Sequence, residues 1–195
     1  MRKKCYRYFG GLMRSQAKWL NKMSASGYRL VRTGKVLYEF EVCEPNEYQY
    51  CVEFIGAKAR SGAEDYRQFL EDLGYRVLFK NINLHWSVGK VNGRPWAEPG
   101  GRLATSSTTL DKELLIIEKR NDGRPFELYT TNEDRIYNTR QMQKPWFYSF
   151  LLFMGCSLFM KHWFWGIFSV LYLIPTVLYQ IEIGRLQKEA NTKEW

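Results

Sequence analysis

The longest apolar stretch of the chain lies near its C-terminus, at residues 145–181, and contains one charged residue, Lys161. As a single helix it would be about 55 Å long, whereas the hydrocarbon core of a bilayer is roughly 30 Å thick. The stretch therefore predicts two membrane-spanning helices, residues 146–160 and 163–181, that meet at a turn formed by Lys161 and His162. The alternative is a helical hairpin buried in a soluble core.

Aromatic and basic residues favour the two-span arrangement. Trp146, Trp163 and Trp165 stand at the predicted membrane–water boundaries, where tryptophan rings are favoured. Basic residues flank the outer ends of both helices, and they are Arg135, Arg140, Lys144, Arg185, Lys188 and Lys193. Because positive charge is retained on the cytoplasmic side, we expect a two-span protein of the cell membrane with both termini in the cytoplasm. The lipid bilayer is thus its first expected partner.

The first half of the chain repeats one pattern of apolar positions. GYRL at residues 27–30 and GYRV at residues 74–77 stand 47 positions apart (74 − 27), and each follows a segment with helical apolar spacing. Each glycine stands where a helix end favours a left-handed residue. The positions that follow alternate as in a strand. We expect the tyrosine and the aliphatic residue to belong to the strand pattern and the arginine to face solvent.

The complete repeat is a strand, a helix and two strands, at residues 3–43 and again at residues 47–89. In the second copy the predicted strand pair is 75–79 with 82–88. One such unit leaves a sheet face and an edge bare, so we expect two copies to pair. The sequence predicts the α+β class: a duplicated strand–helix–strand–strand cytoplasmic domain with a mostly antiparallel sheet, followed by a two-helix transmembrane hairpin. The alternative to a true duplication is that the two helix–glycine–strand joints resemble each other by chance.

Three further segments complete the chain. Residues 91–111 are rich in Gly, Pro, Ser and Thr and predict a long loop, either functional or disordered. Strands are predicted at 113–119 and 126–130, with a turn between them. In chain order, the predicted organisation is a cytoplasmic domain at 1–130, a connecting helix at 131–144, the hairpin at 145–183 and a cytoplasmic tail at 184–195.

The segments KWLNKMSASGYRL, LYEFE, PNEYQYCVEF, FLEDLGYRV and FELYTTNED precede the apolar tail. Together they resemble a bacterial family known only as a domain of unknown function, and the resemblance covers most of the chain. It rests on structural motifs, namely aromatic strands and helix caps, and implies a membrane-associated cytoplasmic domain. Members of that family are often encoded beside PadR-type transcriptional repressors, which implies regulation by association. The loop at 91–111 is longer than the resemblance leads us to expect.

The charge of the chain adds a candidate surface. The formal net charge is +9, and the first 38 residues contain no acidic residue. This basic segment begins with four positively charged residues, Arg2, Lys3, Lys4 and Arg7. On a domain tethered to a membrane such residues are attracted to anionic lipids, so we assign them to the membrane surface rather than to nucleic acid. The four cysteines lack metal-ligand spacing and are expected to be reduced thiols.

No reaction is visible in the sequence. His85 lies on a predicted strand without an accompanying nucleophile motif, and His162 lies in the predicted membrane turn. Paired carboxylates fall on polar positions of predicted helices, where solvation and helix dipoles explain them; they are Glu64-Asp65, Glu71-Asp72 and Glu133-Asp134. No phosphate loop or dinucleotide fingerprint is present. We therefore expect no catalytic residue, no metal, no cofactor and no enzymatic activity.

The remaining candidate is a binding cleft between the two repeats. Tyr38, Trp86, Trp96 and Glu98 would supply stacking and charge there, although Trp96 could instead pin its loop onto the sheet. We expect a membrane-anchored cytoplasmic sensor or regulatory module that binds an amphiphilic small molecule or a protein partner. An accessory subunit of a membrane transporter is the alternative, and a membrane enzyme ranks last.

Overall fold

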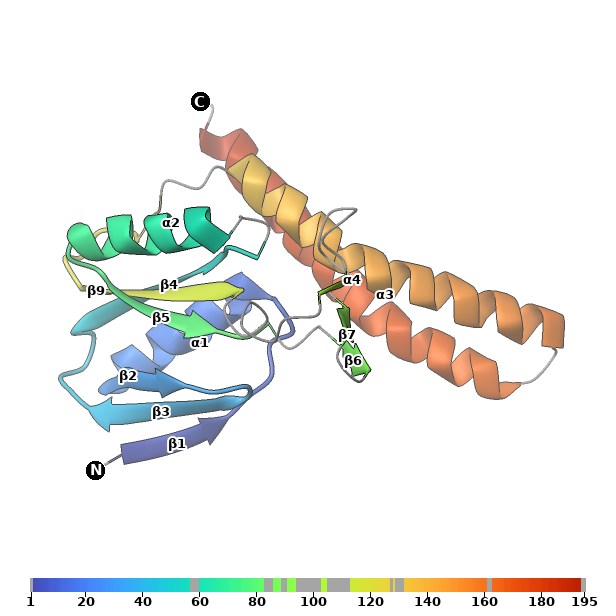
Figure 1. Ribbon diagram of the computed structural model, residues 1–195, viewed down its shortest axis with the longest axis horizontal. Helices are drawn as coiled ribbons and strands as arrows, with labels where there is room; N and C mark the ends of the chain where they lie inside the picture. Colours follow the sequence, from blue (N-terminus) through green and yellow to red (C-terminus); the bar gives the residue numbers. More distant parts are fainter. Residues whose placement is uncertain are drawn as a thin grey trace. The chain divides into compact units, whose positions relative to one another are not determined.

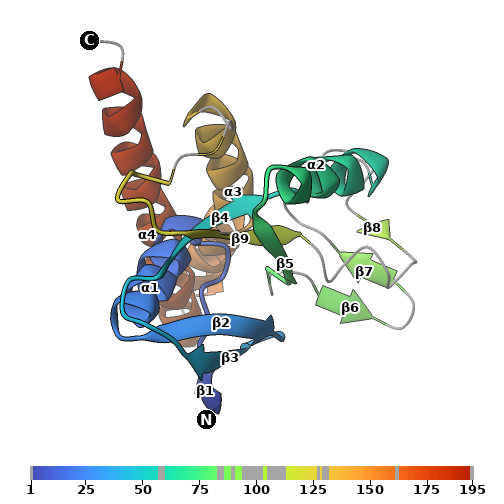
Figure 2. The same ribbon diagram turned by 90° about the vertical axis from the view of Figure 1, so that its left-hand side faces the viewer.

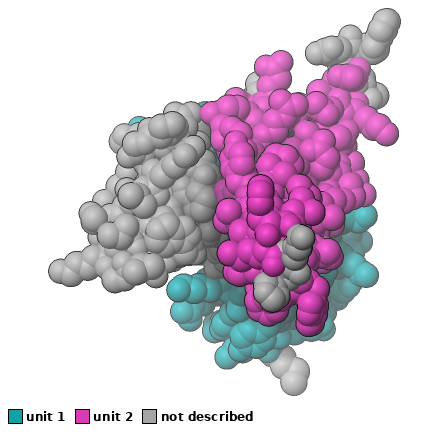
Figure 3. All heavy atoms as spheres, turned by 90° about the vertical axis from the view of Figure 1, so that its right-hand side faces the viewer, with its two compact units in different colours: residues 1–94, 103–128 teal, residues 95–102, 129–195 magenta. Residues whose placement is uncertain are grey.

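The computed structural model describes residues 2–56, 60–82, 86–88, 91–93, 103–104, 113–126, 128, 132–160 and 163–193. The chain divides into two compact units, coloured separately in Figure 3: residues 1–94 with 103–128 form the first, and residues 95–102 with 129–195 form the second. The described residues form an α+β protein with two larger antiparallel sheets, one small sheet and four helices (Figure 1). The predicted α+β class is confirmed.

The first repeat follows the predicted order of elements. It consists of β1 (Arg2–Tyr6), α1 (Met13–Ala25), β2 (Tyr28–Thr33) and β3 (Leu37–Val42), and its sheet has the order β1-β3-β2. Gly27 follows the C-terminal cap of this helix, and its φ of 80° is the left-handed conformation that glycine adopts without strain. The backbone N–H of Gly27 donates to Ser24 O at 2.9 Å, which closes the last turn.

The second repeat has the same topology. It consists of β4 (Tyr48–Phe54), α2 (Arg60–Asp72), β5 (Arg76–Lys80) and β9 (Leu114–Arg120), and its sheet has the order β4-β9-β5. In both sheets the last strand of the repeat lies between the other two. Gly74 ends the second helix region with a φ of 84°, just as Gly27 does in the first copy.

The partner of β5 differs from the prediction. Of the predicted partner segment 82–88, the described residues 82 and 86–88 do not pair with β5; instead β5 pairs with β9, from Arg76 opposite Glu118 to Lys80 opposite Leu114. The middle strand of this sheet is buried on both faces, since Leu114 to Ile117 are all less than 2% exposed. Such a strand needs apolar residues at consecutive positions, which β9 provides and the alternating segment 82–88 does not.

The chain between β5 and β9 is therefore an insertion in the second repeat. Its described parts include β6 (Trp86–Val88), β7 (Val91–Gly93) and β8 (Leu103–Ala104), which form a small antiparallel sheet of order β6-β7-β8. The prediction that 91–111 is loop alone is thus wrong for the residues in β7 and β8.

The predicted hairpin between 113–119 and 126–130 is also wrong. Strand β9 pairs with β4 on one side and with β5 on the other, so neither of its edges is open to a further strand. The described residues Phe126 and Leu128 belong to no strand. Leu128 instead belongs to the buried core of the second repeat, and Phe126 packs against that core. The turn at 121–123 does form, because Gly123 adopts a φ of 74° and its N–H donates to the Asn121 side chain at 3.0 Å.

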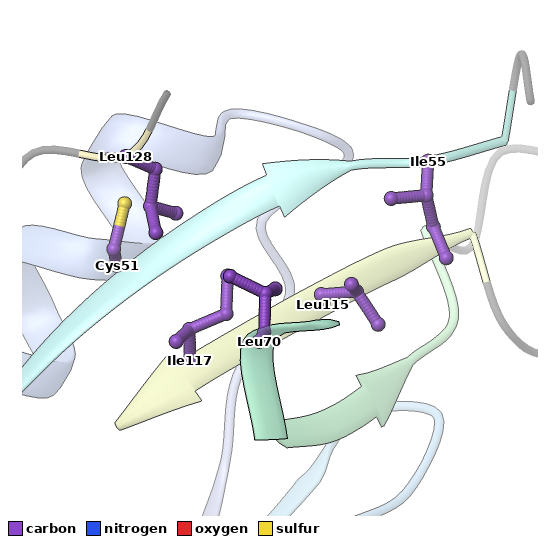
Figure 4. Close-up of a cluster of buried hydrophobic side chains, with 6 residues drawn as sticks. All are labelled: Cys51, Ile55, Leu70, Leu115, Ile117 and Leu128. Atoms are coloured by element: carbon purple, nitrogen blue, oxygen red, sulfur yellow. The ribbon is translucent and has the colours of Figure 1, made fainter. Parts of the chain in front are cut away.

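The core of the second repeat lies between α2 and one face of its sheet. Figure 4 shows Leu70 of α2 in one cluster with Cys51 of β4, Leu115 and Ile117 of β9, and two residues outside the strands, Ile55 and Leu128. The intervening residues Tyr50, Ile116 and Glu118 point to the opposite face, because side chains alternate along a strand. That opposite face belongs to the contact with the first repeat.

Helix α1 covers the outer edge of β4, beside which it lies in Figure 2. The carboxamide of Asn21 donates to Tyr50 O at 2.9 Å and accepts from Tyr50 N–H at 2.8 Å, as a neighbouring strand would. The hydroxyl of Ser24 donates to Tyr48 O at 2.6 Å. The helix of the first repeat thus satisfies backbone groups that an open sheet edge would leave unpaired.

The second unit contains two long helices, α3 (Asn132–Met160) and α4 (Trp163–Lys193), which pack against each other. The predicted connecting helix and first span form one continuous helix, with Pro145 inside it. The predicted tail from residue 184 is helical up to Lys193.

One of these helices is long and apolar enough to cross a membrane. The segment Trp163–Asn191 meets this criterion, with a mean hydropathy of 1.6. Among the described helices α3 does not meet it, since its first half is polar and only residues 146–160 are apolar. Length and composition therefore give weak support for membrane association and do not support the two-span prediction.

The left-handed glycine of the second repeat is testable by substitution. We expect Gly74→Ala to destabilise the protein by about 1 kcal/mol, because a side chain disfavours this backbone conformation although the site has open space. The control Gly62→Ala lies in α2, also has open space, and should be neutral or slightly stabilising. Urea unfolding of the full chain in mild detergent measures both. Equal stability of the two variants would contradict the assigned role of Gly74.

Candidate functional site

The two arginines of the repeated GYR motif converge on one carboxylate. Arg29 on β2 donates to Glu118 Oε1 through Nε at 3.0 Å and through Nη2 at 2.8 Å. Arg76 on β5 brings Nη1 to 3.4 Å from the same oxygen. The Glu118 side chain is only 2% exposed, whereas those of Arg29 and Arg76 are 28% and 35% exposed. The expectation that these arginines simply face solvent is therefore wrong.

Tyr50 completes this buried cluster from β4. Its hydroxyl donates to Glu118 Oε2 at 2.8 Å and accepts from the backbone N–H of Leu30 at 2.8 Å. Burial raises the pKa of Tyr50, so the hydroxyl keeps its proton and can fulfil both roles. Arg29, Arg76, Tyr50 and Glu118 are hereafter the seam cluster, because they join elements of both repeats.

Further side chains bridge the neighbouring edges of β2 and β5. Arg76 donates to Leu30 O at 2.9 Å and to Val31 O at 3.1 Å, and Thr33 donates to Phe79 O at 2.6 Å. Side chains thus replace a regular backbone ladder between the two strands. The seam is a network of charge-assisted hydrogen bonds, which fixes the register of one repeat against the other.

A small pocket lies at one end of this seam. It has a volume of about 190 Å³ and is lined by Thr33, Gly34, Lys35, Phe79, Lys80 and Asn81. The Lys80 side chain comes from the end of β5 and the turn residues from the β2–β3 connection. The Lys80 residue is 3% exposed, and burial lowers its pKa to about 8. Its ammonium donates to Gly34 O at 2.6 Å and also to Lys35 O.

Tyr38, predicted to contact a ligand, belongs to the core of the first repeat. It is 1% exposed, and its ring lies 4.9 Å from the Trp19 ring and 6.1 Å from the Phe9 ring. Its hydroxyl accepts from Gln16 Nε2 at 3.1 Å. The Tyr38 ring also lies 5.1 Å from the Lys80 ammonium, so it forms part of the lysine's surroundings rather than an open stacking surface.

Of the other residues predicted to contact a ligand, only Trp86 lies in the part of the chain that the structure describes. Trp86 begins β6, and the structure describes its backbone alone. Trp96, Glu98 and His85 lie outside the described residues, as do Lys161 and His162. The cleft beneath a Trp96 loop therefore stays a prediction.

The basic residues assigned to the membrane surface divide between two faces of β1. Arg2 lies opposite Glu41 and Lys4 opposite Glu39, whereas Lys3 points to the other face. Lys3 Nζ lies 4.2 Å from the centre of the Tyr28 ring. Beyond the strand, the Arg7 guanidinium lies 5.3 Å from the rings of both Phe9 and Trp19. The membrane-surface role of these residues stays a prediction.

The predicted interface tryptophans occupy different environments in the second unit. The Trp163 residue is 78% exposed at the start of α4. The Trp165 ring stacks with the Phe153 ring at 5.8 Å, and the Trp146 ring lies 5.9 Å from the Tyr172 ring. Trp165 and Trp146 therefore help α3 and α4 to pack together, and Trp163 points outward.

Sequence reasoning missed Glu118 and Lys80, the two buried charges at the seam. A signal was present, since each follows consecutive apolar residues, in LLIIE and in RVLFK. Among the described residues, no group of three or more His, Cys, Asp and Glu side chains could hold a metal. In the seam cluster each acceptor oxygen of Glu118 receives a donor, an arrangement suited to holding the two repeats together.

Fold and seam define a class: a two-repeat α+β domain joined to a pair of long helices with apolar surfaces. Residues 13–151 match the family described as "Protein of unknown function (DUF2812)", and because this match spans more than half of the chain, the protein belongs to that family. No curated protein and no solved structure matches the chain. Bacterial origin and a gene position beside PadR-type repressors stay predictions.

The seam cluster makes a direct prediction about stability. We expect Glu118→Gln to lower the free energy of unfolding by about 3 kcal/mol, because it leaves two arginines without their buried counter-charge. Glu41→Gln is the matched control: Glu41 pairs with Arg29 at 3.7 Å but is 45% exposed, so its loss should cost less than about 1 kcal/mol. Urea unfolding of the full chain in detergent compares the two. Similar losses would contradict a special role for Glu118.

Lys80 predicts a pH-dependent contribution to stability. Its folded pKa of about 8 lies below the ordinary 10.5, so the unfolded chain binds more protons between these values and stability rises with pH there. Below about pH 8 both states carry the proton, and the full penalty of burying the charge is present. Relative to Lys80→Met, we expect the wild-type free energy of unfolding to rise by roughly 3 kcal/mol from pH 7.5 to pH 10.5. Parallel pH profiles would contradict this.

Proposed function

We propose that this protein is a membrane-anchored, non-enzymatic interaction module, whose two-repeat domain acts in the cytoplasm as a sensor or regulator. The observation that carries the proposal is the apolar exterior of α3 and α4. Large apolar side chains there are more than half exposed, among them Leu152, Leu158, Phe159, Met160, Trp163, Ile167, Val170, Leu171 and Ile174. Monomeric soluble proteins rarely expose contiguous apolar surface of this kind, whereas a bilayer accommodates it.

We further propose that both helices enter the membrane as a hairpin. Phe153 of α3 stacks with the rings of Tyr172 at 5.1 Å and Phe168 at 5.5 Å on α4. Gln143 of α3 donates to Thr176 O at 3.0 Å and to Gln180 Oε1 at 3.0 Å. Insertion of α4 alone would remove these contacts. The apolar part of α3 is short, at about 22 Å for residues 146–160, so local thinning of the bilayer would accompany it.

The distribution of basic residues supports one orientation for the hairpin. Arg135, Arg140 and Lys144 precede the apolar part of α3, and Arg185 and Lys188 follow that of α4. Positive charge next to membrane spans favours the cytoplasmic side. We therefore place both termini and the two-repeat domain in the cytoplasm.

A second candidate role uses the same surface differently. The exposed faces of α3 and α4 could pack against the helices of a polytopic protein, which would make this chain an accessory subunit of a transporter. Purification in mild detergent separates the two roles, because a stoichiometric polytopic partner supports the accessory role and its absence favours the sensor or regulator.

Membrane insertion is tested with charged substitutions on α4. We expect the wild-type protein to stay with membranes after a carbonate wash. The double variant Val170→Lys with Ile174→Lys should be released or degraded, because each lysine near the centre of a span costs about 3 kcal/mol. The matched control, Val36→Lys with Val42→Lys, places two lysines at exposed positions of the first unit and should stay membrane-bound. Carbonate release of the wild-type protein would overturn the proposal.

The same membranes distinguish one span from two. In sealed vesicles, epitope tags at the N- and C-termini should be cut by added protease together or protected together if the hairpin crosses twice. Accessibility of one tag alone would show a single span and would refute the two-span part of the proposal while leaving anchorage intact.

A further inference from the structure

The pocket at the end of the seam has an unusual charge. Its described lining residues include Lys35 and Lys80 and no acidic residue. It lies wholly within the first unit, between the β2–β3 turn and the last residues of β5. The charge of this lining decides which kind of ligand could enter.

Lys80 is a buried cation for which the described residues provide no ionic partner. Among the described residues no carboxylate forms an ion pair with it; its partners are the carbonyl oxygens of Gly34 and Lys35 and the face of the Tyr38 ring. The carbonyl oxygens and the aromatic ring carry only partial negative charges, in contrast to the full negative charge of a carboxylate. Lysines are almost never fully buried without a counter-charge, since removal of an ammonium from water is costly. The pocket therefore contains a positive charge that the surrounding protein only partly compensates.

We propose that this pocket binds a small oxyanion, the phosphate or carboxylate group of a ligand, through Lys80 and Lys35. The inference names a ligand class for the proposed interaction module, and it rests on that module being a binding domain and not on its membrane anchor. The pocket of about 190 Å³ suits a head group rather than a large metabolite.

The other polar groups of the pocket shape the expected affinity. The Thr33 hydroxyl donates to Phe79 O, and the Gly34 N–H donates to Leu37 O at 2.8 Å, so both are engaged within the protein. We expect recognition to depend mostly on lysine charge, because an ammonium acts as a point charge without a fixed geometry. We expect binding that tolerates both phosphate and carboxylate and weakens as the salt concentration rises.

Anion binding and the protonation of Lys80 are linked. Burial lowers the pKa of Lys80 to about 8, and an anion beside the ammonium favours its charged form. Among the described groups, the Tyr38 ring and the two turn carbonyls contact the Lys80 ammonium, Lys35 lines the same pocket, and the Glu113 carboxylate accepts from Ile82 N–H at 3.1 Å. Bound anion should therefore raise the pKa of Lys80, a readout that reports the site itself.

The experiment titrates the full chain in neutral detergent with inorganic phosphate, at constant ionic strength set by chloride. Nuclear magnetic resonance of the lysine side chains follows binding and the pKa of Lys80. We expect saturable binding that raises this pKa, at least a tenfold loss of affinity in Lys80→Met, and a severalfold loss in Lys35→Gln. Lys18→Gln removes the same charge from an exposed position on α1 outside the pocket and should leave binding unchanged.

A second arm distinguishes the source of the anion. The protein is placed in phosphatidylcholine vesicles with or without phosphatidic acid and without free phosphate. A rise in the pKa of Lys80 only with phosphatidic acid assigns the anion to a lipid head group, and a rise only with inorganic phosphate assigns it to a soluble ligand. Either outcome supports an oxyanion site.

Three results would overturn the inference: no saturable binding in either arm, an unchanged pKa of Lys80, or equal losses in Lys18→Gln and Lys35→Gln. Lys35→Gln keeps the Lys80 contacts, so it decides the question should Lys80→Met fail to fold. Release of the protein by carbonate would refute anchorage and leave the phosphate titration unaffected. Failure of the titration in membrane-bound protein would refute the anion site alone.

Discussion

The first unit depends on one buried carboxylate. Glu118 stands on the central strand of the second sheet and receives Arg76 from its own repeat and Arg29 from the other. Its remaining oxygen accepts from Tyr50, whose hydroxyl in turn accepts from the backbone of β2. A buried charge tolerates few positions of its partners, because each lost contact leaves the charge uncompensated. The repeats are therefore held in one register, and the Lys80 pocket exists only because β5 and the β2–β3 turn keep this relation.

The same repeat geometry explains why the array stops at two copies. Leu20 of α1 is fully buried, and α1 covers the edge of β4 through Asn21 and Ser24. A shift of 47 positions carries Leu20 to Arg67, which pairs at 2.6 Å with Glu64 and with Glu71. An ion-paired surface is suited to water and not to a third strand edge, as in the polar terminal repeats of stacked proteins. Helix α2 thus caps the structure at this end.

The second unit follows a different principle. Its helices meet through aromatic rings and a glutamine, and turn most of their large apolar side chains outward. The proposed anchorage and the proposed anion site lie in separate units of the chain. A ligand that altered the Lys80 pocket would act on the first unit, where the two repeats are joined.

The sequence by itself determined the local elements, since helix spacing, the two left-handed glycines and strand alternation depend on neighbouring residues alone. It also showed the repeat and the apolar helices. It misplaced the partner of β5, because residues 82–88 alternate well and stand next in the chain, while β9 lies beyond an insertion. From the sequence, Arg29 and Arg76 were expected to face solvent and Tyr38 to line a cleft. The sequence pointed to no role for Lys80. Only the tertiary structure decided these points, because burial of a charge depends on which distant strand covers it and not on its neighbours in the chain.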